Sequence, residues 1–256
     1  MLTITFVRHG QSQDNLKNIW AGWKDAPLSD LGVQQAAALG RAFRTSDTKF
    51  DHIYASDLKR ANATGRAIHD AHCDPKPPFT TSTKLREQHF GIGEGHPWVL
   101  NVPSGNRELA ELFTQNIFPV LRERDARFPE GESLDDLARR ADSAIAEFVV
   151  PHLEASASKD VHIAIASHGL CISELVAALL RLDPDSERGI SYSGLMNTAW
   201  TRAVVTVKDP ALPVAVQVTH VNVADHLAQL NVIELQEDVD DSRAAARAFF
   251  GGKAVA

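Results

Sequence analysis

Two short apolar runs of this chain each end beside a histidine that is followed by a glycine. Residues 2–7 end next to His9, and residues 161–166 end next to His168. Continuous apolar runs of this length are typical of buried strands in a parallel sheet. The carboxyl ends of parallel strands share one edge of the sheet, where open α/β folds bind ligands. If the two strands are neighbours, both imidazoles meet at that edge.

Predicted strands and helices alternate along the chain. Ser29 is a good N-cap for the first helix, and Ser56 or Asp57 is expected to cap the second. The alternation predicts an α/β fold, a three-layer α/β/α sandwich with a mostly parallel central sheet. The expected strands are 2–7, 52–55, 80–85, 161–166, 198–207 and 214–222, and the expected helices are 29–43, 57–71, 106–124, 133–155 with an interruption near Pro151, and 170–182.

The expected organisation is one domain with an insertion and a tail. Residues 88–130 are mixed in character and rich in glycine, so we expect an insertion laid over the active site. The domain is expected to span residues 1–235. Residues 236–256 are acidic and then alanine-rich, and we expect a loosely docked tail.

Composition excludes several classes of protein. The net charge of −7 argues against non-specific nucleic-acid binding, and no apolar stretch reaches the length of a membrane span. Only Cys73 and Cys171 are present, so no disulfide framework is expected and a reducing, cytoplasmic location fits best. The chain starts in a strand, so no signal peptide is expected. None of the 11 histidines has metal-ligand spacing, and no metal site is expected.

Cationic and acidic side chains lie near the same predicted edge. Arg8 directly precedes His9, and Arg60 lies about one turn into the second helix, whose N-terminus attracts anions. Guanidinium groups bind phosphate through paired hydrogen bonds. Glu87 follows an extended piece at the start of the insertion and supplies a carboxyl group.

These residues belong to a series of blocks in a recognisable order. Together, across roughly residues 2–175, they resemble the histidine phosphatase superfamily, the phosphoglycerate mutase-like enzymes, and in particular its phosphatase branch. The blocks are residues 8–12 with Asn15, 20–23, 27–32 with 35–36, 56–61 with Thr64, 85–91 with 94–95, 128–133 and 167–169.

The resemblance implies a role for each site residue. His9 is then the nucleophile that becomes phosphohistidine, and Glu87 is the proton donor and acceptor. Asn15 either hydrogen-bonds the phosphate or orients its loop. The implied catalytic residues are Arg8, His9, Arg60, Glu87 and His168, and the implied phosphate-binding residues are Arg8, Gln11, Asn15, Gly22, Arg60, His168 and Gly169.

Physical chemistry agrees with these roles. Flanking cations are expected to lower the pKa of His9 and keep its imidazole neutral and nucleophilic. The like charge of a bound phosphate favours the protonated form of Glu87, which can then protonate a leaving alcohol. Phosphoryl transfer depends mainly on positioning and charge stabilisation. Because two arginines supply that charge, no metal or other cofactor is expected.

Three functions remain open, and a phosphomonoester hydrolase is the leading hypothesis. Phosphoglycerate mutases carry Glu-Arg-His-Tyr-Gly where this chain has Gln88 and Phe90, and their long basic insertion is missing; Arg107 is the single arginine or lysine of residues 96–120. A phosphoglycerate mutase is the alternative. A non-catalytic phospho-ligand binder is a third, and the retained histidines and arginines argue against it. The expected partner is a small phosphate ester, whether sugar phosphate, nucleotide or phosphoprotein group, and a homo-oligomer is compatible with the sequence.

Overall fold

A six-stranded sheet forms the centre of the molecule, in the order β3-β2-β6-β1-β7-β8. The computed structural model describes residues 1–100, 108–187, 190, 192, 194–207 and 214–230. The strands of this sheet are β1 (Leu2–Arg8), β2 (His52–Ser56), β3 (Phe79–Ser82), β6 (Val161–Ser167), β7 (Trp200–Thr206) and β8 (Ala215–Val223). The helices that flank it are α1 (Asp30–Thr45), α2 (Lys59–Ala71), α4 (Leu134–Phe148), α5 (Val150–Ser156) and α6 (Gly169–Leu180).

The two histidine-bearing strands are neighbours. β1 pairs with β6 in parallel, with Leu2 opposite Val161 and Arg8 opposite Ser167. β2 is parallel to β6 on its other side, and β3 is parallel to β2. β7 and β8 continue the sheet in antiparallel pairings. The sheet is therefore mostly parallel, as predicted, and His9 and His168 both follow its carboxyl edge.

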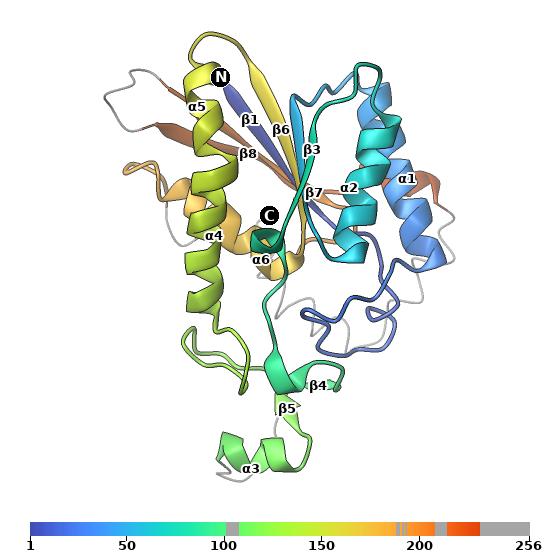
Figure 1. The fold of residues 1–256 in the computed structure, drawn as a ribbon, viewed down its shortest axis with the longest axis vertical. Helices are drawn as coiled ribbons and strands as arrows, with labels where there is room; N and C mark the ends of the chain where they lie inside the picture. The colour runs from blue at the N-terminus through green and yellow to red at the C-terminus, as the bar shows by residue number, and fades with distance from the viewer. Residues whose placement is uncertain (101–107, 188–189, 191, 193, 208–213, 231–256) are drawn as a thin grey trace.

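Alternate residues of the central strands face two separate helical layers. Leu2, Ile4 and Phe6 pack into a large core with α4 and α6, whereas Val7 packs into a smaller core with α1 and α2. Figure 1 shows α4 and α5 on one side of the sheet and α1 and α2 on the other. This alternation follows from the two-residue period of a strand. It confirms the predicted three-layer sandwich.

Side-chain caps begin two of the helices. The hydroxyl of Ser29 accepts the N–H of Gly32 at 3.0 Å, as the sequence predicts for α1. Ser133 and Asp136 accept each other's backbone N–H groups and form a capping box at the start of α4. The interruption predicted near Pro151 falls between α4 and α5, at Val149.

The prediction that Ser56 or Asp57 caps α2 is wrong. The N-cap is Leu58, which makes no side-chain cap bond. Both predicted caps have other partners. The hydroxyl of Ser56 lies 3.0 Å from the ring of His168, and the carboxylate of Asp57 binds the guanidinium of Arg86 at 2.8 Å.

Residues 88–130, which the sequence predicts to be an insertion, carry a small sheet and a short helix of their own. β4 (Trp98–Val99) pairs with β5 (Phe118–Pro119), and α3 (Leu109–Thr114) lies between them in sequence. In Figure 1 these elements lie together at the end of the molecule opposite the N-terminus. Their core is aromatic and includes Trp20, Phe118 and Phe128. The 3-10 turns η1 (Thr83–Leu85) and η2 (Gly91–Gly93) connect β3 to this region.

The predicted helix over 106–124 is wrong in length. Only Leu109–Thr114 is helical, because Asn116 takes a left-handed conformation with φ 56° and turns the chain towards β5. Residues 106 and 107 lie outside the described residues. The tail predicted at 236–256 also lies outside them, so that boundary stays a prediction. No helix within the described ranges is long and apolar enough to cross a membrane.

Candidate active site

His9 and His168 meet at the carboxyl edge of β1 and β6. Their ring centroids are 5.0 Å apart, and the ring planes are tilted by 59°. The N–H of His9 donates to the carbonyl oxygen of Ser167 at 3.0 Å, which continues the pairing of the strands beyond their ends. Both side chains are buried. The convergence predicted from the two His-Gly pairs is therefore present.

His9 is held in one tautomer and without charge. Its Nδ1 lies 2.7 Å from the carbonyl oxygen of Gly10, and because a carbonyl oxygen only accepts, Nδ1 carries the proton. Nε2 then keeps its lone pair. Burial lowers the pKa of His9 well below its ordinary value, and the charges of Arg60 and Arg8 lower it further. The sequence predicted the effect of the cations, but burial is the larger cause.

Two guanidinium groups, of Arg8 and Arg60, carry the positive charge of the site. Arg60 is 2% exposed and donates to the carbonyl oxygens of Gly22 at 2.7 Å and Lys24 at 2.8 Å. Arg8 donates to one backbone carbonyl oxygen, and its Nε is buried without a partner. Burial lowers the pKa of both arginines, whereas the negative charge of Glu87 acts in the opposite direction.

His168 presents a second buried nitrogen without a partner, Nδ1. Its Nε2 lies 3.0 Å from the hydroxyl of Ser56. That hydroxyl accepts the N–H of Leu58 at 3.3 Å and can donate its own proton to Nε2 of His168. When it does so, the ring proton resides on Nδ1. Burial also lowers the pKa of His168 well below its ordinary value, so the ring is neutral.

The described residues contain two buried side-chain nitrogen or oxygen atoms without a hydrogen-bond partner, Arg8 Nε and His168 Nδ1. A buried donor left unpaired costs about 1–3 kcal/mol. Such exceptions call for a specific explanation. Both atoms belong to the same site, and an anion with several oxygens is the partner that would satisfy them together.

Glu87 lies at the N-terminus of α6. Its carboxylate accepts the N–H of Cys171 at 3.0 Å and that of Leu170 at 3.2 Å. A helix N-terminus stabilises negative charge. A β-carbon at Gly169 would lie 3.9 Å from both Arg8 Nε and Glu87 Oε2, so the guanidinium and the carboxylate lie around one glycine.

Gln11 and Asn15, predicted to bind phosphate, have side-chain oxygens engaged within their own loop. Asn15 Oδ1 accepts the N–H of Ser12 at 2.9 Å. Gln11 Oε1 accepts the hydroxyl proton of Ser29 at 2.7 Å, at the start of α1. In this arrangement both amides orient the loop that follows His9.

Gly22, also a predicted phosphate-binding residue, orients Arg60. Its φ is +47°, in the region that favours glycine, and its carbonyl oxygen accepts from the guanidinium. A β-carbon there would lie 2.1 Å from the carboxylate of Glu94. No larger residue fits without moving that carboxylate.

Trp23 is a residue that sequence reasoning missed. Its indole N–H donates to the carbonyl oxygen of Glu87 at 2.8 Å, and its backbone N–H donates to Glu94 at 2.7 Å. Its ring packs against His89 with centroids 4.6 Å apart. The carbonyl oxygens of its two neighbours, Gly22 and Lys24, accept from the guanidinium of Arg60. Trp23 therefore links the two segments that position Arg60 and Glu87. It lies in a block of the resemblance, which gave it no role.

Arg140 was missed as well, although the sequence contains a signal for it. It follows Leu137 by three residues and precedes Ala141, both fully buried, so it falls on the apolar face of α4. Its guanidinium binds the carboxylate of Glu132 at 2.7 Å and the carbonyl oxygen of Glu87 at 2.9 Å. An arginine on an apolar face indicates buried polar partners.

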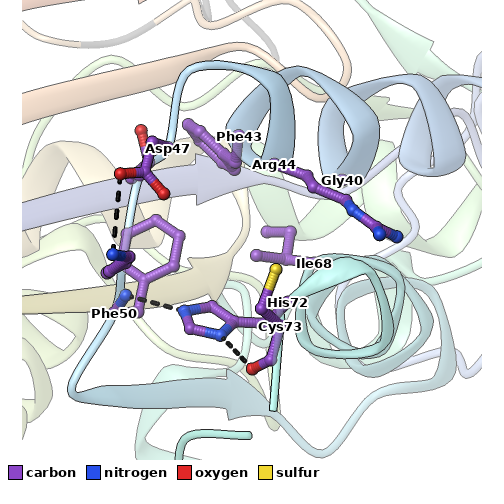
Figure 2. A pocket seen from close by; sticks show the side chains of 10 residues that line it. Gly40, Phe43, Arg44, Asp47, Phe50, Ile68, His72 and Cys73 are labelled. Atoms are coloured by element: carbon purple, nitrogen blue, oxygen red, sulfur yellow. Dashed lines mark hydrogen bonds and ion pairs between the residues drawn. The ribbon is translucent and has the colours of Figure 1, made fainter. Parts of the chain in front are cut away.

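A separate hollow lies near the amino-terminal end of β2, at the edge of the sheet opposite the two histidines (Figure 2). It is lined where α1 and α2 end and β2 begins, with Phe43, Phe50 and Ile68 as its apolar wall. The ring of His72 accepts the N–H of Phe50 at 3.0 Å, and Cys73 is exposed beside it. About 20 Å³ is open to water-sized molecules, room for about one water. This hollow is too small for a phosphate ester.

No three histidine, cysteine, aspartate or glutamate side chains are grouped as a metal site in the part of the chain that the structure describes. The neutral histidine, the two arginines and the carboxyl group lie together at the carboxyl edge of the sheet. Residues 4–215 match the histidine phosphatase superfamily (branch 1), and the chain belongs to this family.

The proteins that this chain resembles in sequence and those that it resembles in fold carry different names. The chain is 30% identical over 190 residues to the 2,3-bisphosphoglycerate-dependent phosphoglycerate mutase of Methylocella silvestris, covering 74% of this chain and 87% of that protein. A Bradyrhizobium mutase of the same name is 31% identical over 182 residues, covering 71% and 83%. The fold is similar to that of a mycobacterial glucosyl-3-phosphoglycerate phosphatase, with a TM-score of 0.65, 23% identity, and 86% and 98% of the two chains covered.

Proposed function

We propose that this protein hydrolyses phosphomonoesters through a phosphohistidine intermediate on His9. The observation that carries the proposal is the pair of buried, unpartnered nitrogen atoms, Arg8 Nε and His168 Nδ1, beside an uncharged imidazole. With its proton on Nδ1, His168 joins Arg8 and Arg60 as a donor to the equatorial oxygens of a transferring phosphoryl group.

The reaction has two balanced steps. In the first, Nε2 of His9 attacks phosphorus, the ester P–O bond breaks, and protonated Glu87 gives its proton to the leaving oxygen. In the second, Glu87 takes a proton from water as the water oxygen attacks phosphorus. The N–P bond then breaks and inorganic phosphate leaves. The N-terminus of α6 supports this cycle because its N–H groups stabilise Glu87 whenever it is ionised.

A phosphoglycerate mutase is the second candidate, and the names of the 30–31% identical relatives favour it. Two residues argue for hydrolysis. The amide of Gln88 donates to the carbonyl oxygen of Glu132 at 2.7 Å, and Phe90 packs on Trp20 in the insertion core. Neither side chain is available to a second anionic group of a sugar acid.

The test is a pair of assays on the purified protein. Hydrolysis of a panel of phosphorylated metabolites and p-nitrophenyl phosphate is compared with conversion of 3-phosphoglycerate, with and without the bisphosphate. We expect hydrolysis to exceed mutase turnover. Mutase turnover that is stimulated by the bisphosphate and exceeds hydrolysis would make the protein a mutase. Phosphate binding without hydrolysis of any monoester would make it a binding protein.

We further propose that catalysis needs no metal, because Arg8 and Arg60 supply the charge that Mg²⁺ supplies elsewhere. Activity is therefore expected to survive dialysis against a chelator. Loss of activity on chelation with recovery on adding a divalent cation would contradict this.

A further inference from the structure

One turn of the chain, residues 195–199, holds the backbone that carries the proposed nucleophile. The carbonyl oxygen of His9 accepts from the N–H of Thr198 at 3.2 Å and from the side-chain amide of Asn197 at 3.1 Å. The N–H of Arg8 donates to the carbonyl oxygen of Ala199 at 3.0 Å. We call this segment the support turn.

The support turn also fixes the guanidinium of Arg8, which donates to the carbonyl oxygen of Leu195. The His9 carbonyl and the Arg8 side chain therefore depend on the same five residues. The contacts of Arg60 and His168 described above come from other segments. A shift of the support turn would move the nucleophile relative to the groups that bind the phosphate.

Thr198 has an uncommon conformation for its residue type. Its φ is +58°, a region that β-branched residues rarely occupy, and its side chain is fully buried. Backbone in such a conformation persists only where the surroundings enforce it, and such positions cluster at functional sites. At Thr198 the conformation accompanies an N–H that reaches the His9 carbonyl.

One contact that supports this conformation is local, and another comes from the C-terminal part of the described chain. The hydroxyl of Thr198 donates to the carbonyl oxygen of Asn197 at 2.7 Å, and it lies 2.9 Å from Nε2 of His226. Because the single hydroxyl proton goes to that carbonyl, the His226 ring is the donor in the second contact. His226 belongs to the 3-10 turn η3 (Asp225–Gln229).

A second contact supports the same turn from β8. The N–H of Met196 donates to the side-chain oxygen of Asn222 at 2.8 Å. The end of β8 and the turn that follows it thus hold the support turn at two points.

We propose that His226 is a positioning residue of this enzyme: through Thr198 it fixes the support turn, and through that turn the position of His9. The inference rests on the proposed function, because it assigns His226 to the step in which His9 attacks phosphorus. His226 itself touches neither the site donors nor the nucleophilic ring in the contacts described.

The test compares two replacements of His226. His226→Phe keeps a planar ring and removes the donor, whereas His226→Gln keeps an N–H near the place of Nε2. We expect His226→Phe to lower kcat about tenfold, since a misplacement of 1 Å can cost about a hundredfold and one lost support moves the nucleophile less. KM is expected to change less than about threefold, because Arg60 and His168 still bind the phosphate. His226→Gln is expected to keep at least about half of kcat.

A second pair of variants tests the route through Thr198. Thr198→Val removes the hydroxyl at nearly constant shape, and Thr198→Ser retains it. We expect Thr198→Val to resemble His226→Phe, Thr198→Ser to retain activity, and the double variant to lose no more than either single one. Unchanged kcat in His226→Phe, equal losses in the Phe and Gln variants, or fully additive losses in the double variant would overturn the proposal.

One readout does not depend on turnover. The ¹⁵N resonances of the His9 ring report its hydrogen bond to Gly10, and they are expected to shift in His226→Phe but not in His226→Gln. If the wild-type protein hydrolyses no phosphomonoester, the proposed function fails, and these resonances still decide whether His226 positions His9. Unshifted resonances in His226→Phe would then overturn the positioning role.

Discussion

His9 combines burial, a fixed tautomer and the absence of charge on one imidazole. Replacing it by alanine removes the group that we propose accepts the phosphoryl group covalently. We therefore expect His9→Ala to retain less than about 1% of the wild-type kcat. The measurement is steady-state hydrolysis of p-nitrophenyl phosphate, together with an acid-labile label from ³²P substrate on the wild-type protein. Turnover above that level in a folded variant would mean that water attacks the ester directly.

Glu87 is expected to matter most for leaving groups that need a proton. In Glu87→Gln an amide remains beside the N-terminus of α6 but cannot protonate an alkoxide. We expect release of an alkyl alcohol to slow at least about tenfold more than release of p-nitrophenol, whose anion is stable. Rates for the two ester types on the same enzyme samples give the comparison. If both slow equally, Glu87 is not the proton donor.

At the scale of elements, Arg140 joins α4 to the segment that leads into Glu87. It binds Glu132 and the carbonyl oxygens of Lys84, Arg86 and Glu87, and its side chain is 14% exposed. Arg140→Met removes the cation that faces Glu132 and the donor to the carbonyl oxygens of Lys84 and Arg86, whereas the Glu87 carbonyl keeps the indole N–H of Trp23. We expect the free energy of unfolding to fall by about 3 kcal/mol, measured by urea denaturation, because breaking an ion pair that is largely shielded from water is costly.

The neighbouring arginine is the matched control. Arg139 also pairs with a carboxylate, that of Asp136, but its side chain is 70% exposed. Arg139→Met is expected to change the free energy of unfolding by less than about 1 kcal/mol, as for surface ion pairs. Equal losses in the two variants would show that the contacts of Arg140 to the Glu87 segment add nothing to stability.

The elements differ in how well the sequence predicts them. β1 and β6 are predicted within one residue because each is a short apolar run that ends in polar residues. The segment after Leu109 could not be predicted in this way. Its aromatic residues suit either a helix or a strand, and the turn at Asn116 is fixed by the packing of Phe118 against Phe128. That contact depends on residues ten positions further along the chain.

At the scale of the molecule, the sequence predicts the positions of the site histidines better than the roles of the residues that support the site. His9 and His168 follow the ends of parallel strands, so they meet at the carboxyl edge because the two strands are neighbours in the sheet. The roles of Trp23, Arg140 and Thr198 depend on backbone carbonyl and N–H groups of distant segments. Side-chain patterns indicate at most that such partners exist, as for Arg140, and only the assembled structure shows which groups they are.

The histidines outside the active site predict how the whole molecule responds to acid. Burial lowers the pKa of His162 to about 4, with Arg202 acting in the same direction and Asp51 opposing it. Burial likewise lowers the pKa of His226 to about 4. In the unfolded chain both titrate near pH 6.5. Between these values the unfolded state binds more protons than the folded state.

The contribution of these two histidines to the free energy of unfolding is therefore expected to be constant above about pH 6.5 and to fall as the pH drops towards 4. His162 alone contributes a slope of up to about 1.4 kcal/mol per pH unit in that window. Urea denaturation at half-unit steps from pH 7.5 to 4.5 measures the slope.

In His162→Gln the slope is expected to be smaller than in the wild type, whatever stability the variant loses at pH 7.5. The contact of His162 with the Thr5 hydroxyl, 2.8 Å long, contributes at every pH, so its loss lowers the whole curve without changing its slope. A variant whose slope equals that of the wild type would show that protonation of His162 does not drive the acid sensitivity.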